Sequence, residues 1–197
     1  MIVGCINSKG NILVGTNNCM PPCWLDIQPG VTKREDVIKI LRKREQSKEG
    51  YLTLLEDGII RWQSLDGYNS YFYAAQNEFV TKTEVDLRSS SLRLDDLILT
   101  FGEPQKLDIN NVEGGYFLAT MFYPKKGLSF VVSGDKFDIS TPNLKFYFNP
   151  DLVVLKGIFF NPMDDISAMI NLLYASNTAP SALTNIQNWI GYGVYYK

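Results

Sequence analysis

The chain has 197 residues, of which 45% are hydrophobic and 20% are charged, so a globular protein with a sizeable core is expected. Lys and Arg number 19 against 21 Asp and Glu, and this net charge of -2 argues against nucleic-acid binding. Histidine is absent, which excludes Ser-His and Cys-His nucleophiles and removes the commonest nitrogen ligand of metals. No apolar run reaches about 18 residues, so no segment is expected to span a bilayer.

Cys5 follows Met1-Ile2-Val3-Gly4, that is, two aliphatic residues and a small one. This order is similar to a bacterial lipobox, whose cysteine carries the lipid, although the charged and apolar stretches of a signal peptide do not precede it. Two interpretations stay open: Cys5 is lipidated, or it is an ordinary thiol near the terminus.

Cys19 and Cys23 flank Met20-Pro21-Pro22, a stiff turn that can bring two Cα atoms within disulfide range. A metal site would need further Cys or His ligands, which the sequence does not supply. A disulfide and a pair of reduced, buried thiols remain as the alternatives. A lipidated Cys5 and a disulfide would both indicate an exported protein.

Residues 1–22 are predicted to form a flexible tether, because residues 6–22 are rich in Asn, Gly and Ser. A first αβ unit is expected over 23–90. Its helix spans 32–42, where the spacing of Thr32 and Glu35 matches a capping box and the apolar residues fall on one helical face.

Three strands are expected after this helix, at 59–63, 71–75 and 80–87. The last of them alternates. Val85 and Leu87 are predicted to face the core, and Lys82, Glu84 and Asp86 to face water.

A second αβ unit is expected over 91–162. Its helix, 92–101, ends before Gly102 and Pro104, and Asp96-Leu97-Ile98 can be aligned with Asp36-Val37-Ile38 of the first unit. Strands are predicted at 116–123, 128–132 and 153–160, with a hairpin turn at 124–127. Residues 163–197 are expected to form a C-terminal helical tail on the same core, with helices at 164–174 and 181–190.

The fold class predicted from this pattern is α+β. It consists of two tandem α-β-β-β units that share an antiparallel sheet, with the helices packed on one face.

A resemblance accompanies this pattern. The segment 27–37, which contains Pro29-Gly30-Val31-Thr32, and the segment 97–104, which ends in Gly102-Glu103-Pro104, are similar to the two ends of one helix motif. Small envelope lipoproteins of the BamE/SmpA type and the wider β-lactamase-inhibitor-protein-like fold have this motif. The whole arrangement most resembles tandem-repeat uncharacterised bacterial lipoproteins, such as those of Chloroflexi. The resemblance implies a scaffold or partner-binding role and supplies no catalytic residues.

Acidic pairs at 95–96 and 164–165 fall in the first turn of predicted helices, where carboxylates stabilise the helix dipole. The sequence thus predicts no enzyme, no metal and no cofactor.

Aromatic side chains are the remaining candidates for binding, and alternate members of a strand must point to opposite faces of the sheet. An exposed aromatic face would mark a partner surface, whereas a face covered by the tail or by loop 133–150 would be core. The candidate binding residues are Trp62, Tyr71, Tyr73, Tyr116 and Tyr123.

The predicted function is that of a non-enzymatic, lipid-anchored lipoprotein on the extracytoplasmic face of a bacterial membrane, where it binds another envelope protein. Membrane contact would come only through the lipid on Cys5. The alternative is a carrier that holds a small apolar or glycan ligand in an aromatic cleft.

Overall fold

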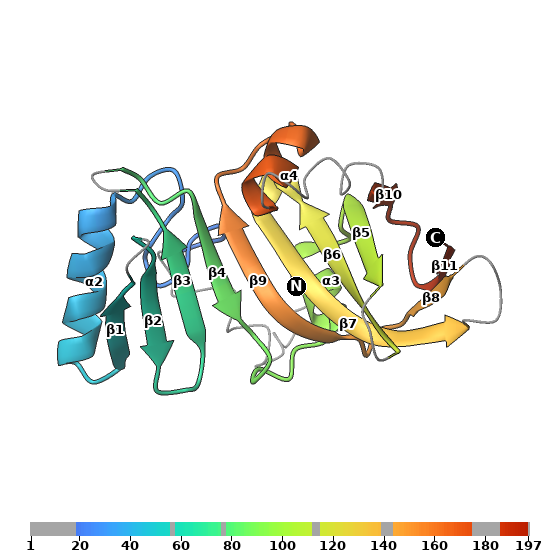
Figure 1. Ribbon diagram of the computed structural model, residues 1–197, viewed down its shortest axis with the longest axis horizontal. Helices are drawn as coiled ribbons and strands as arrows, with labels where there is room; N and C mark the ends of the chain where they lie inside the picture. The colour runs from blue at the N-terminus through green and yellow to red at the C-terminus, as the bar shows by residue number, and fades with distance from the viewer. Residues whose placement is uncertain are drawn as a thin grey trace, which may run out of the picture.

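A single large antiparallel sheet organises the computed structural model, which describes residues 19–55, 58–75, 78–111, 115–138, 144–174 and 186–196 (Figure 1). In spatial order its strands are β1 (Gly50–Leu54), β2 (Ile60–Ser64), β3 (Asn69–Tyr73), β4 (Lys82–Asp86), β9 (Val153–Phe160), β7 (Leu128–Asp138), β6 (Tyr116–Tyr123), β5 (Lys106–Asn111) and β10 (Ile186–Asn188). Beyond this path, β8 (Lys145–Phe148) pairs with both β7 and β11 (Gly193–Tyr196). The α+β class with a large antiparallel sheet is thus what the structure has.

The main core covers the face of the sheet that we call the inner face, which carries Phe72, Val85, Phe130 and Phe159. Helix α2 (Arg34–Gln46) and helix α3 (Leu94–Phe101) contribute buried apolar residues to this core. Their 3.6-residue periodicity gives each helix one apolar stripe, which is the side that packs on the sheet.

The third helix lies on the opposite, outer face. Met169 and Ile170 of α4 (Ile166–Leu173) pack in a second cluster that contains Phe122, whereas the neighbouring Met121 and Tyr123 belong to the main core. Because successive strand residues point to opposite faces, α4 cannot share the face of α3. Figure 1 shows α3 behind the strands and α4 in front of them. The expectation that the helices pack on one face therefore does not hold for α4.

The strands form two meanders that meet at β4 and β9. The first runs β1-β2-β3-β4 and the second β5-β6-β7-β9, each through antiparallel neighbours. The two last strands pair over 82–86 and 156–160, with Glu84 opposite Ile158 at the centre of this ladder. One continuous sheet results.

The starts of α2 and α3 have the same pattern of backbone hydrogen bonds to the sheet. Lys33 and Arg93, which precede the two helices, form antiparallel bridges with Phe79 and Val153. Phe79 lies shortly before β4, and Val153 is the first residue of β9. The amide of Arg34 donates to the carbonyl of Glu78, and that of Val80 to Thr32, at 2.9 Å each. The corresponding bonds at α3 run from Leu94 to Leu152 at 2.9 Å and from Val154 to Leu92 at 3.0 Å.

Several sequence expectations need correction. Thr32 does not cap α2, because its hydroxyl accepts from the amide of Gln28 at 2.9 Å and the N-cap residue is Lys33. The segment predicted as a helix at 181–190 contains the strand β10, since pairing with the edge of β5 overrides the local pattern. Strands β1, β5, β8 and β11 were not predicted, and β11 lies in the tail that was expected to be helical. Strand β1 is largely exposed and β5 is mostly polar.

Candidate functional site

The outer face of the sheet holds a hollow of about 600 Å³ where the two meanders meet. Its apolar part comes from Leu118, Val131 and Leu155, and Tyr71 and Tyr174 supply rings. The charged and amide side chains that line it are Glu84, Asp86, Arg88, Asn110 and Lys156, and Thr120 adds a hydroxyl. This hollow is the candidate site.

A row of paired residues crosses the hollow from strand to strand. Asp86 lies opposite Lys156, Lys156 opposite Val131, Val131 opposite Thr120, and Thr120 opposite Asp108. Neighbouring strands are about 4.8 Å apart, so this row extends for about 19 Å. The row defines two ends of the site, one at Asp86 and one at Asp108.

Glu84 forms the centre of the charged end. Lys82 donates to its Oε1 and Lys156 to its Oε2, both at 2.9 Å, while only 14% of the Glu84 side chain is exposed. Burial acts to raise the pKa of this carboxyl, but the hydrogen bonds and charges of the two lysines outweigh it, so that the pKa lies below its ordinary value. Lys82 and Glu84 thus form a largely buried ionic network with Lys156, and not the simply solvated strand face that the alternation predicted.

Asp86 is held by Arg88, which donates to both carboxylate oxygens. These hydrogen bonds lower the pKa of Asp86, against a smaller opposing effect of burial. Tyr71, opposite Glu84 in the β3 and β4 ladder, lies beneath the guanidinium of Arg61, whose carbon is 6.0 Å from the ring centroid. Both carboxylates that line the hollow are therefore ionised and paired.

Asp108 lies at the other end of the row, is only 1% exposed, and is not itself one of the residues that line the hollow. Its Oδ2 accepts from the Tyr174 hydroxyl at 2.8 Å and from the side-chain Nδ2 of Asn110 at 3.0 Å. Its Oδ1 is buried and has no hydrogen-bond partner in the described part of the chain. The pKa of Tyr174 is raised, mainly by burial and further by the nearby Asp108.

The candidate aromatic residues are divided between core and surface. Trp62 and Tyr123 are buried in the main core and offer no surface to a ligand. Tyr71 lines the hollow, and Tyr73 is half-buried beside it with the ammonium of Lys82 4.4 Å from its ring centroid. Tyr116 is 57% exposed and lies in another hollow.

This second hollow, of about 410 Å³, is lined by the start of β6, the middle of β7 and the end of β8. Tyr116 and Tyr147 border it, together with the carboxylates of Asp135 and Asp151. Both rings are large exposed apolar surfaces.

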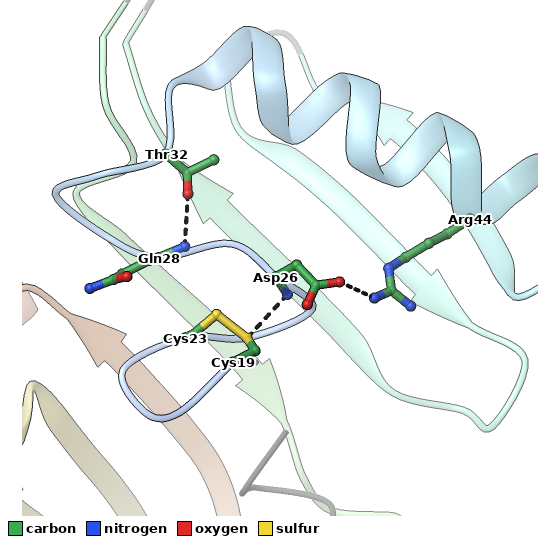
Figure 2. Close-up of a disulfide and its surroundings, with 6 residues drawn as sticks. All are labelled: Cys19, Cys23, Asp26, Gln28, Thr32 and Arg44. Atoms are coloured by element: carbon green, nitrogen blue, oxygen red, sulfur yellow. Dashed lines mark hydrogen bonds and ion pairs between the residues drawn. A yellow bond between two sulfur atoms is a disulfide. The ribbon is translucent and has the colours of Figure 1, made fainter. Parts of the chain in front are cut away.

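Cys19 and Cys23 form a disulfide, with their Cα atoms 5.2 Å apart (Figure 2). The amide of Asp26 donates to Sγ of Cys19 at 3.2 Å, and the Asp26 carboxylate pairs with Arg44 of α2 at 2.6 Å. The loop thereby fixes Trp24 against Phe159, with ring centroids 5.6 Å apart, and against Ser70, whose hydroxyl accepts from Nε1 at 2.9 Å. Cys5 lies outside the described residues.

One member of each acidic pair accepts hydrogen bonds at the start of a helix, and in the second pair this member, Asp165, is the N-cap residue of α4 and does not lie in its first turn. Asp96 accepts from the amide of Arg93 at 2.9 Å, and Asp165 from the amides of Ser167 and Ala168 at the start of α4. Asp95 instead accepts from the Tyr192 hydroxyl at 3.1 Å. Within the described ranges, no three His, Cys, Asp or Glu side chains gather as a metal-binding group.

Sequence reasoning missed Asp108 and Tyr174 as site residues. Asp108 lies in the polar segment Lys106–Asn111, which was not recognised as a strand. Tyr174 is the C-cap residue of α4 and reaches the hollow only because α4 packs on the outer face. Local sequence carries no signal for such a contact.

Comparison with known proteins yields no match, whether with family models, curated proteins or solved structures. None of the helices in the described segments has the length and apolar character needed to cross a bilayer.

Proposed function

We propose that this chain is a non-enzymatic binding module that holds a small ligand in the hollow on the outer face of the sheet. The observation that carries this proposal is the combination of apolar walls, two tyrosine rings and fixed charges around about 600 Å³, which is a volume typical of ligand sites. The proposal adopts the carrier alternative in preference to a flat docking surface.

The state of the carboxylates favours binding over catalysis. Acid-base chemistry with two carboxyl groups needs one of them protonated near neutral pH, with a raised pKa. Glu84 and Asp86 have lowered pKa values because lysine and arginine side chains pair with them. Such pairs hold the polar groups of a site in place before a ligand arrives.

The experiment is a fragment screen by NMR on the isotope-labelled protein. We expect the bound fragments to shift amide signals of β4, β6 and β9, and Leu118→Trp, which fills the hollow, to abolish this binding. Tyr147→Ala, in the second hollow, is the matched control and should bind as the parent does. A screen whose binders all map elsewhere, or bind equally to Leu118→Trp, would refute the proposal.

We also propose that the two meanders are repeats of one α-β-β-β-β unit, and that the ligand site lies at their junction. Three observations support this. Lys33 and Arg93 occupy matching positions before the helices, which is the same register that aligns Asp36 with Asp96. The last strands pair about a centre at Glu84 and Ile158, as an approximate twofold axis requires. In this relation Lys82 corresponds to Lys156.

A protein partner is the second candidate. It is favoured by Tyr116 and Tyr147, which line the second hollow together and are 57% and 47% exposed. Exposed tyrosines give contact area at low entropic cost. A photo-crosslinking amino acid at Tyr116 should then give one discrete adduct in cells, and the same group at exposed Thr53 should not. Equal adducts from both positions would exclude this surface.

We also propose that the protein is located in the cell envelope, with Cys5 lipidated as in the BamE-type lipoproteins that the sequence resembles. The Cys19–Cys23 disulfide supports an oxidising compartment, where such bonds persist. The intact mass of natively expressed protein tests the anchor. A diacylglycerol adduct on Cys5 supports it, and an unmodified polypeptide from Met1 removes it.

A further inference from the structure

We infer that the hollow binds a primary amine, with Asp108 as the counter-ion of its ammonium group. This inference rests on the proposed function and specifies the ligand class of the same site.

Asp108 is the only carboxylate of the row whose charge no described cation balances. Both of its hydrogen-bond donors, Tyr174 and Asn110, are neutral, and both use Oδ2. None of the ion pairs in the described residues includes Asp108, and its Oδ1 is left without a partner. A buried carboxylate in this condition is strongly destabilised, and an ammonium group would remedy it.

The position of Asp108 connects it to the hollow. It occupies the outer-face row directly beside Thr120, and Asn110, Thr120 and Tyr174 all line the hollow. Asp108 does not itself line the hollow, and Asn110 and Tyr174, which both donate to its Oδ2, connect it to the lining. In this proposal an ammonium group reaches Oδ1 when one of these two side chains rotates away from the carboxylate.

The remaining charges restrict the ligand further. Glu84 already binds two lysines, and Asp86 is bound by Arg88, so neither carboxylate calls for another cation. Lys156 and Arg88 would repel a second positive charge at that end. A monoamine fits best, with its ammonium at Asp108 and an apolar body on Leu118 and Val131.

The test compares benzylamine with benzyl alcohol, its neutral analogue, by NMR titration of the full chain. We expect benzylamine to bind at least about tenfold more tightly, and Asp108→Asn to remove this preference while leaving benzyl alcohol unaffected. Asp151→Asn, in the second hollow, is the charge-matched control and should change neither probe.

Tyr174→Phe provides a second variant, because it leaves the carboxylate in place and removes one of the two neutral donors to Oδ2, which leaves more of the negative charge for an ammonium group. We expect it to tighten benzylamine binding and to preserve the preference over the alcohol. This variant decides the question if Asp108→Asn does not fold.

Equal binding of the two probes in the hollow would overturn the amine inference and leave the proposed function intact. Binding of benzylamine that persists in Asp108→Asn has the same meaning. Absence of binding by both probes, together with an empty fragment screen, would overturn the inference and the proposed function together.

Discussion

Lys156 on β9 donates to Glu84 on β4, with Nζ 2.9 Å from Oε2, and so joins the two meanders on the outer face. Lys82 holds the other oxygen of the same carboxylate. One acidic side chain thus forms ion pairs with two lysines at the centre of the sheet.

Glu84→Gln should destabilise the protein by about 1–2 kcal/mol, because it leaves Lys82 and Lys156 close together without a counter-ion. Urea unfolding at pH 7 measures this change. Glu103→Gln replaces an exposed glutamate and should stay within about 0.5 kcal/mol of the parent. Equal stabilities of the two variants would contradict the importance of the network.

The free energy of unfolding should fall as the pH is lowered from about 5 to 3. The folded-state pKa values of Glu84 and Asp86 are lowered, so the stability that they contribute is present above their unfolded values and is lost as the pH falls through the folded ones. Glu84→Gln should flatten this dependence. Parallel pH curves for parent and variant would show that Glu84 does not titrate as described.

Replacing Cys19 and Cys23 by serine should cost about 2 kcal/mol, the chain-entropy contribution of a bridge that closes so short a loop. Chemical unfolding of the oxidised parent and of the double variant gives the value. Dithiothreitol should lower the stability of the parent alone. A reductant effect of the same size on the variant would assign the change to another cause.

Trp24 and Ser70 should be energetically coupled by about 1 kcal/mol, since the indole donates to a buried hydroxyl 46 residues away. A double-mutant cycle with Trp24→Phe and Ser70→Ala measures the coupling, and phenylalanine keeps a ring against Phe159. Additive single-variant effects would mean that packing alone fixes the loop.

Gly127→Ala should be among the most destabilising single-methyl changes. Gly127 has φ +65°, and a Cβ there would come within 2.2 Å of the carbonyl oxygen of Phe160, so backbone strain and a clash combine. Gly102→Ala is the control, because Gly102 also has a positive φ, +75°, with nothing within 4 Å of the added carbon. Comparable unfolding free energies for the two variants would remove the clash from the explanation.

Much of the fold could be predicted from periodicity. The helices expected at 32–42 and 92–101 correspond to α2 and α3, and the pattern of 80–87 placed Val85 and Leu87 in the core. Strand β5 escaped prediction because a buried aspartate makes its sequence resemble a loop. The helix expected near residue 186 failed because β10 exists only through pairing with another strand.

The candidate site could be predicted from sequence periodicity only in part. Alternation shows that Tyr71 and Phe72 point to opposite faces, but it does not reveal which face the helices cover. Trp62 and Tyr123 lie on the covered face, whereas Tyr71 lies on the outer one. The hollow also depends on α4, whose Met169 and Ile170 pack with Phe122 and Ile158, and a local sequence pattern does not reveal such long-range partners.

The pairing of β4 with β9 determines what happens when the chain is cleaved between the two meanders. Each of these strands would be an open edge if its partner were removed, and open edges promote aggregation. A cut in the turn at 88–91 should therefore yield two fragments that recover their solubility by reassociating, as halves of a split reporter do.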